Sequence, residues 1–342
     1  MRPKVLLIGG TLNQTTMTRA IGRHLEADSD CWYTPYYADG FLGQLARRRM
    51  VEFTALGGRH RRNTERFFHD ESVCVDVEGR RQDYDLVVTC SDLIVPGNVR
   101  GRRLVLVQEG MMEPAGLAYY GVRYLGLPRY LANTAATGLS DAYSSFCVAS
   151  PGYRELFVER GVRRDKIVVT GIPNFDDVDG FRANDFPHHG YVLVVTSNGR
   201  ETFKGGDRQA LLEKAKRIAA GRPLIFKLHP AEDVARARRE IMAVLPQALI
   251  LEDGNTNHMV ANCEVLVAEH SSVIFIGLAM GKEVHANLDL QELRRLLPIQ
   301  NGGRSAHAIA QVCRQVLAAP QRRPIAASRP RWLGGWPEAS GT

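Results

Sequence analysis

The stretch Leu224–Pro230, LIFKLHP, joins an apolar run to a lysine, a histidine and a proline. Side chains alternate along a strand, so Lys227 and His229 are expected on one face, at the carboxyl end of a buried strand. Pro230 has no N–H to donate to a neighbouring strand and is expected to end this one. Because a lysine and an imidazole can both donate to an anionic oxygen, the pattern predicts a phosphate site. A histidine here can alternatively serve to cap the following helix.

A second cluster lies in residues 265–284, VLVAEHSSVIFIGLAMGKEV. An apolar run leads into Glu269 and the pair Ser271 and Ser272, after which a helical pattern continues to Gly281. Serine hydroxyls beside the free N–H groups of a helix start suit a phosphate. N-capping by Ser271 alone is the plainer interpretation, and the two are compatible.

A third strand followed by a polar turn is expected in residues 194–206, VVTSNGRETFKGG, with Ser197, Asn198 and Arg200 as candidate diphosphate contacts. His258, in GNTNHMVANCEVL, is expected to begin a helix beside the nucleotide pocket and to touch the base. No GxxxxGK[ST] motif occurs, and IGGTLNQTT after the first apolar run is not a GxGxxG fingerprint. ATPase and NAD-dependent dehydrogenase functions are therefore disfavoured.

Candidates for a general base lie in the first half of the chain. The segment RLVLVQEGMMEP ends an apolar run with Glu109, the first candidate, and Glu113, the second. A carboxylate in a dehydrated cleft has a raised pKa, which suits a base working near neutral pH. Asp92, in CSDLIVPG, follows another apolar run and is the third candidate. Glu109 can alternatively serve only to accept a hydrogen bond from a backbone N–H of a neighbouring loop.

The elements that position these residues read as an α/β protein. Short apolar runs, each followed by Gly, Ser, Asn or Pro, alternate with helix-patterned segments, which is typical of doubly wound parallel sheets. The expected strands lie within residues 4–10, 84–90, 103–110, 145–150 and 166–171, and then 191–199, 223–230, 248–254 and 263–272.

The turn-rich segment 171–190 divides these runs into two groups. We expect an N-terminal Rossmann-like domain over residues 1–172, a linker over 173–190, a second such domain over 191–320 and an irregular tail over 321–342. Ligands of open α/β sheets bind at the carboxyl ends of the strands, so the clusters above should face a cleft between the domains.

Composition sets wider limits on the function. The chain has 342 residues, a net charge of +7 and six cysteines without a CxxC pair, which argues against a zinc site and a disulfide framework. No apolar run is long enough to span a bilayer, and we expect a cytoplasmic protein. Seven arginines in residues 46–67 indicate either a solvated helix face or a surface for the anionic inner face of a membrane. Nucleic acid is disfavoured because no aromatic residues are interleaved with the arginines.

The series VVTGIPNFD, FKLHP and EHSSVIFIGLAMGKEV resembles the second half of GT-B-fold glycosyltransferases, above all CDP-glycerol glycerophosphotransferases and the capsule and sialic acid transferases that use CMP-activated donors. The resemblance implies that His229 with Pro230, and Ser271 with Ser272, grip the cytidine nucleotide and its phosphate. UDP-N-acetylglucosamine 2-epimerases share the layout, including the VTG segment and a later GK.

The resemblance and the residues together predict a GT-B transferase. It would move a group from a CMP-, CDP- or UDP-linked donor to a surface-glycan or lipid-linked acceptor, as in the synthesis of cell-surface polysaccharide. No cofactor or metal is expected, because Lys227, Arg200 and His229 can neutralise the leaving phosphate. The alternatives are a UDP-sugar 2-epimerase or hydrolase, and a non-catalytic nucleotide-sugar-binding protein.

Overall fold

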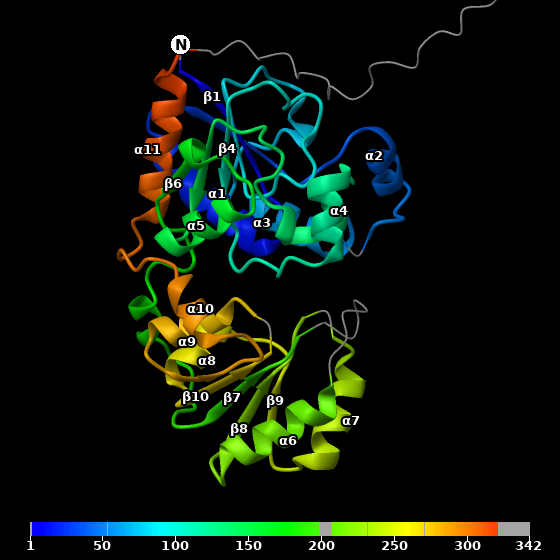
Figure 1. Ribbon diagram of the computed structural model, residues 1–342, viewed down its shortest axis with the longest axis vertical. Helices are drawn as coiled ribbons and strands as arrows, with labels where there is room; N and C mark the ends of the chain where they lie inside the picture. Colours follow the sequence, from blue (N-terminus) through cyan, green and yellow to red (C-terminus); the bar gives the residue numbers. More distant parts are fainter. Residues whose placement is uncertain (1, 53, 198–206, 231, 270, 321–342) are drawn as a thin grey trace, which may run out of the picture.

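Two parallel β-sheets, each covered by helices, make up the protein (Figure 1). The computed structural model describes residues 2–52, 54–197, 207–230, 232–269 and 271–320. The first sheet has six strands in the order β2-β1-β3-β4-β5-β6, and the second has five in the order β11-β10-β7-β8-β9. In each sheet the chain starts at an inner strand and winds outward in both directions. The predicted α/β class with two doubly wound domains is therefore confirmed.

The first domain follows from strands that are apolar on both faces. All four residues of β3 and of β4 are buried, as expected where helices cover both sides of a parallel sheet. Its strands are β1 (Lys4–Ile8), β2 (Asp30–Thr34), β3 (Leu86–Thr89), β4 (Leu104–Val107), β5 (Ser145–Val148) and β6 (Ile167–Val169). Its helices are α1 (Leu12–Leu25), α2 (Gly40–Arg47), α3 (Gly58–Asp70), α4 (Leu117–Leu125) and α5 (Pro151–Glu159), with short 3₁₀ turns η1 (Val77–Gly79), η2 (Arg129–Ala136) and η3 (Arg164–Lys166).

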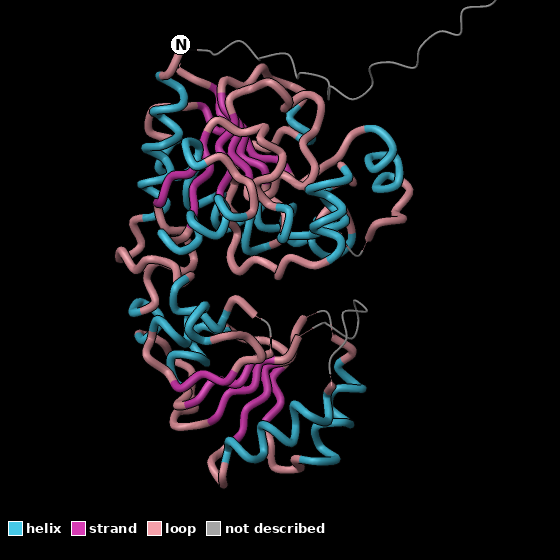
Figure 2. The backbone as a smooth tube through the Cα atoms, in the orientation of Figure 1, coloured by secondary structure: helices cyan, strands magenta, loops and turns pink. Residues whose placement is uncertain are grey.

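The second domain is smaller and has its own apolar cluster under α6 and α7. Its strands are β7 (Val192–Val195), β8 (Leu224–Lys227), β9 (Leu249–Leu251), β10 (Val265–Ala268) and β11 (Glu283–His285). Its helices are α6 (Arg208–Ala219), α7 (Val234–Val244), α8 (Thr256–Asn262), α9 (Val273–Ala279) and α10 (Leu290–Arg295), and η4 (Asp179–Arg182) lies in the connection before β7. Figure 2 shows the two sheets as separate layers in the two halves of the molecule.

The last helix, α11 (Ser305–Ala318), returns to the first domain, where it packs on α1 and on β3, β4 and β5. The sequence-based division gave residues 305–320 to the second domain, and the structure differs here. The reason is that the buried side of α11, which includes Ile309, Ala310 and Cys313, covers the first sheet. The chain thus passes between the domains twice, and the two passages are joined because Ser305 N donates to the buried carboxylate of Asp176 at 2.8 Å.

Across the described ranges, none of the helices combines the length and the apolar character needed to cross a bilayer.

Candidate functional site

A cleft of about 1400 Å³ lies between the domains. Its walls include the segment that follows β4 in the first domain and those that follow β7, β8 and β9 in the second. β7 lies where the chain order of the second sheet reverses, which is the place where ligands of open α/β sheets bind. The two walls come close together, since a Cβ added to Gly110 would lie 3.8 Å from Cβ of Ser272.

Glu109 comes from the first domain and is half-buried in this cleft. Its Oε1 accepts a hydrogen bond from Thr11 Oγ1 at 2.7 Å, and its Oε2 accepts one from Gln14 Nε2 at 2.6 Å. Burial raises the pKa of Glu109, whereas these two hydrogen bonds lower it. Each carboxylate oxygen keeps acceptor capacity for a further group, so Glu109 can still receive a proton from a ligand.

The start of α1 supplies both donors because it forms a capping box. Thr11 Oγ1 accepts from Gln14 N, and Gln14 Oε1 accepts from Thr11 N, which fixes both side chains. Asn13 Nδ2 also donates to the backbone carbonyl of Glu109 at 3.0 Å. The first turn of α1 therefore holds Glu109 in one orientation.

The other two acidic candidates differ in position. Glu113 lines the cleft, and its N–H donates to Thr134 Oγ1 at 3.1 Å. Asp92 is fully buried away from the cleft lining, and its carboxylate accepts from the N–H groups of Gly138 and Ser140 at 3.0 and 3.1 Å. Asp92 therefore holds a loop of the first domain, because burial and these two hydrogen bonds keep it from any ligand in the cleft.

Lys227 is buried at the end of β8 and lines the cleft. Its Nζ donates to the carbonyl oxygens of Leu228 at 3.0 Å and Glu252 at 2.7 Å, and burial lowers its pKa. The ammonium group thus ties together the carboxyl ends of β8 and β9. Its charge lies at the cleft wall, although the sequence alone gave no sign of these backbone partners.

His229 and Pro230 follow Lys227 along the same wall. The backbone N–H of His229 donates to Thr196 Oγ1 at 2.9 Å, and Thr196 in turn donates to the buried carboxylate of Glu232. This network fixes the turn at His229 and Pro230. The His229 side chain is half-buried and lines the cleft.

The serine pair lies where the sequence predicted, immediately before α9. Ser271 and Ser272 both line the cleft, and Ser271 Oγ accepts from Val273 N at 3.4 Å. Ser272 occupies the N-cap position without a side-chain capping bond. Ser197, after β7, lines the cleft as well, whereas Asn198 and Arg200 lie outside the described residues.

Two nucleotide candidates lie outside the cleft lining. His258 is on α8, and it is the preceding residues Thr256 and Asn257 that line the cleft. The carboxylate of Glu269 accepts from Asn287 Nδ2 at 3.5 Å, beside β11. Within the described residues, no group of acidic, histidine and cysteine side chains is arranged to hold a metal ion.

Sequence reasoning missed several residues that line the cleft. Arg59, at the start of α3, donates to the carbonyl oxygen of Pro230 at 2.6 Å and so connects the two walls. Asn174, in the connection between the domains, donates to Asn13 Oδ1 and to Thr16 Oγ1, both at 2.9 Å. The only available signals were the Gly57–Gly58 pair before Arg59 and the density of turn residues around Asn174.

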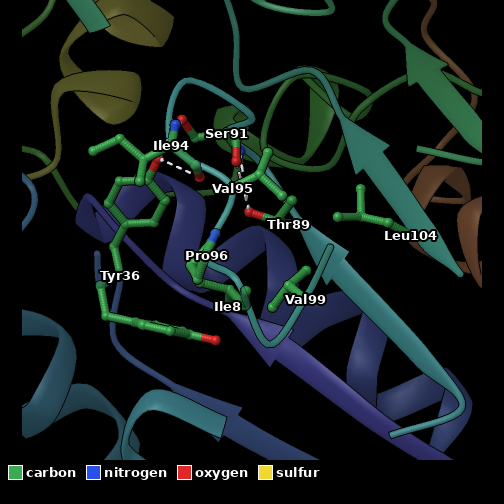
Figure 3. A pocket seen from close by; sticks show the side chains of 10 residues that line it. Ile8, Tyr36, Thr89, Ser91, Ile94, Val95, Pro96, Val99 and Leu104 are labelled. Atoms are coloured by element: carbon green, nitrogen blue, oxygen red, sulfur yellow. Dashed lines mark hydrogen bonds between the residues drawn. The ribbon is translucent and has the colours of Figure 1, made fainter. Parts of the chain in front are cut away.

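A pocket inside the first domain, shown in Figure 3, does not qualify as a ligand site. Tyr36, Thr89, Ser91 and Ile94 are among its lining residues, and Tyr36 Oη lies 3.2 Å from Ser91 Oγ. Its volume of about 10 Å³ is close to that of a single water molecule. This pocket therefore does not compete with the interdomain cleft as the candidate site.

No family model and no curated protein matches this sequence. Solved structures share its fold. A UDP-GlcNAc 2-epimerase from Neisseria meningitidis, bound to UDP-GlcNAc, aligns with a TM-score of 0.56 at 11% identity over 91% of this chain and 100% of that one. A UDP-GlcNAc 2-epimerase from Methanocaldococcus jannaschii, in complex with UDP-GlcNAc and UDP, aligns with a TM-score of 0.52 at 14% identity over 93% and 94% of the two chains.

The wall teichoic acid polymerase TagF, in a crystal soaked with CDPG, aligns with a TM-score of 0.50 at 11% identity over 92% of this chain and 89% of that one. At identities this low the similarity establishes the fold alone. Together with the two parallel sheets, it confirms the GT-B layout that the sequence predicted.

Proposed function

We propose that this protein transfers a group from a nucleotide-activated donor to a hydroxyl of a glycan or lipid-linked acceptor. The donor is CMP-, CDP- or UDP-linked, and its phosphate lies at the wall formed by His229, Ser271 and Ser272. The acceptor hydroxyl lies on the opposite wall, beside Glu109.

One observation carries this proposal: Glu109, a half-buried carboxylate whose pKa burial raises, lines the same cleft as the polar residues His229, Ser271 and Ser272 of the opposite wall. Glu109 and Gly110 are consecutive, and Gly110 approaches Ser272 closely enough that a Cβ there would be in van der Waals contact with it. A donor phosphate held by the serine hydroxyls would then lie within reach of an acceptor hydroxyl bound to Glu109. This is the proximity that a direct displacement needs.

The chemistry proceeds in one displacement. The acceptor oxygen attacks the donor as its proton passes to Glu109, and the nucleotide leaves with the bonding electron pair on its phosphate. His229 and the cationic side chain of Arg59 stabilise the negative charge that develops there, while the ammonium of Lys227 adds to the positive field of the wall. We propose that these groups suffice without a metal ion, so a chelator should leave the rate unchanged.

The test has two parts. A thermal-shift series with CMP, CDP, UDP, GDP and ADP identifies the nucleotide, since a ligand that binds only the folded protein raises its melting temperature. Turnover of the matching sugar or polyol donor is then measured with and without a glycan acceptor. Faster turnover with acceptor supports the transferase, and a protein that no nucleotide stabilises contradicts the proposal.

A UDP-sugar 2-epimerase or hydrolase is the second candidate, because two of the structures that share the fold are UDP-GlcNAc 2-epimerases. Such an enzyme converts UDP-GlcNAc without any acceptor, so the same turnover assay separates the two activities. A protein that only binds nucleotide sugars would gain thermal stability and show no turnover in either arm.

A further inference from the structure

Helix α4 and the segment after it expose large apolar side chains. Leu117 is 92% exposed, Leu125 78% and Tyr124 68%. The remaining exposed members of this surface are Tyr120, Leu127, Tyr130 and Leu131. We call these seven residues the α4 surface.

The inner side of α4 is apolar too. Tyr119 and Val122 are buried in a small cluster with Ala132, Ala135 and Ala136 of η2. Apart from Arg123, the exposed side of α4 is apolar as well, and a helix with apolar residues on both sides is normally covered on both. Soluble proteins rarely leave so many large apolar residues together in water, so the α4 surface has a partner.

The segment that carries the surface has charges of one sign, although Arg123 also donates to the backbone carbonyl of Glu159, at the end of α5, at 3.1 Å. Between Glu113 and Asp141 the chain has no acidic residue, and it has two cations, Arg123 and Arg129. In a symmetric dimer built on this patch, the same positive charges would meet each other, which disfavours a second copy of the chain as the partner. Leucine and tyrosine side chains with nearby arginines are instead the composition of segments that lie in the headgroup region of a membrane.

The apolar and basic character continues on α2. Phe41, near the start of α2, is 72% exposed, and Met50, shortly after its end, is 62% exposed. Between them, residues 47–49 are three exposed arginines. Figure 1 shows α2 and α4 on the same side of the first domain, opposite α11.

The α4 surface is connected to the cleft by the chain itself. Glu113 and Thr134 both line the cleft, and the N–H of Glu113 donates to Thr134 Oγ1. Residues 114–133, which include α4, therefore form a segment that leaves the edge of the cleft and returns to it. We propose that the α4 surface inserts into the headgroup region of an anionic lipid bilayer and brings a lipid-linked acceptor to the Glu109 side of the cleft. The second half of this statement rests on the proposed function, whereas the first does not.

Vesicle sedimentation tests the insertion directly. The full-length protein is mixed with vesicles of phosphatidylcholine alone and with vesicles that also contain phosphatidylglycerol. We expect partition onto the anionic vesicles, weakening as salt is raised because part of the attraction is electrostatic. In the variant Leu117→Ser/Leu125→Ser, partition should fall about a hundredfold, since each leucine that becomes buried in the bilayer contributes about tenfold.

Met242→Ser is the matched control, because Met242 is also an exposed apolar residue, 45% exposed, but on α7 of the second domain. It should bind vesicles as the parent protein does. Equal partition of the parent and the double leucine variant would overturn the proposal, as would equal partition of the parent on the two kinds of vesicle. A dimer in sedimentation velocity that the double variant loses, without vesicle binding by the parent, would assign the surface to a second copy instead.

Nucleotide thermal shifts are recorded on the same variants. A normal shift in the double leucine variant shows that the cleft is intact, so a loss of vesicle binding belongs to the surface. If the parent protein binds vesicles but no nucleotide stabilises it, the proposed function is contradicted, whereas the proposal that the α4 surface inserts into lipid is supported.

Discussion

Glu109 is held in place by the first turn of α1. Three side chains of the first turn of α1 contact it, two through its carboxylate and one through its carbonyl. These contacts tie the end of β4 to α1, although the donors to the carboxylate are side chains and not the backbone N–H that the alternative interpretation expected. A fixed carboxylate with a raised pKa also suits the general base that we propose, so the structural contacts and the proposed role are compatible.

Glu109→Gln separates these roles. If Glu109 removes the acceptor proton, the transfer rate should fall about 10²–10⁴-fold while donor binding stays nearly unchanged. Steady-state kinetics and a nucleotide titration of the same preparation measure the two quantities. Transfer near the parental rate would show that another group is the base, with Glu113 the next candidate in the cleft.

Gln14 is predicted to act through Glu109 as a positioning residue. Its hydrogen bond favours the charged form of the carboxylate, so Gln14→Met should raise the pKa of Glu109 further. Because the base works only when deprotonated, the acidic limb of the kcat/KM profile should move to higher pH. A profile that keeps its shape and only loses height would indicate a general loss of structure.

His229→Ala tests the phosphate wall. A charge-assisted hydrogen bond to a phosphate contributes about 1.5–3 kcal/mol, so nucleotide binding should weaken about tenfold or more. The backbone N–H of residue 229 still reaches Thr196 in the variant, so the turn should be preserved. Calorimetric titration of a folded variant that binds as tightly as the parent would contradict the assignment.

At the scale of elements, the joint between the domains is tighter than the sequence indicated. Ser150 Oγ donates to the carbonyl oxygen of Leu296 at 3.1 Å, which docks the start of α5 against the end of α10. Gly152 lies in the first turn of α5, and a Cβ there would collide with the carbonyl oxygen of Arg295. The glycine is thus required by the contact between two backbones.

Gly152→Ala should therefore destabilise the fold by about 1–3 kcal/mol, as overpacking against backbone does. Gly116→Ala is the control, because nothing lies within 4 Å of a Cβ at that position and its loss as an N-cap should cost less than about 1 kcal/mol. Denaturant unfolding of both variants measures the difference. Equal midpoints would show that the joint has room for a methyl group.

The strands that the sequence predicted and those it missed differ in composition. All nine expected runs contain a strand, and this includes the edge strands β6 and β9, because their residues, IVV and LIL, are as apolar as those of the inner strands. β2 and β11 were missed, since these two edge strands carry polar residues, Asp30 in the first and Glu283 and His285 in the second. The nine runs were also enough to predict which strand ends line the cleft. The contact between Arg59 and Pro230 could not be predicted in this way, since it joins residues far apart in the chain.

For the molecule as a whole, α11 is the element that closes the first domain. A chain ending at Arg304 should lose solubility or cooperative unfolding, because α1 and strands β3 to β5 lose the apolar cover that Ile309, Ala310 and Cys313 provide. A chain ending at Pro320 retains α11 and serves as the control. Calorimetry on both distinguishes loss of the helix from loss of the residues beyond it, and equal melting of the two chains would show that α11 is dispensable.

The return of α11 also sets an order of events on the ribosome. The six strands of the first sheet are complete when Val169 has been made, yet α11, which covers β3, β4 and β5, lies beyond residue 304. At ordinary rates of synthesis, about 10–30 s pass before that helix emerges. The second domain, whose strands and helices α6 to α10 are contiguous in the chain, can finish folding in that interval. The half of the protein that is translated first is thus the half that reaches its native state last.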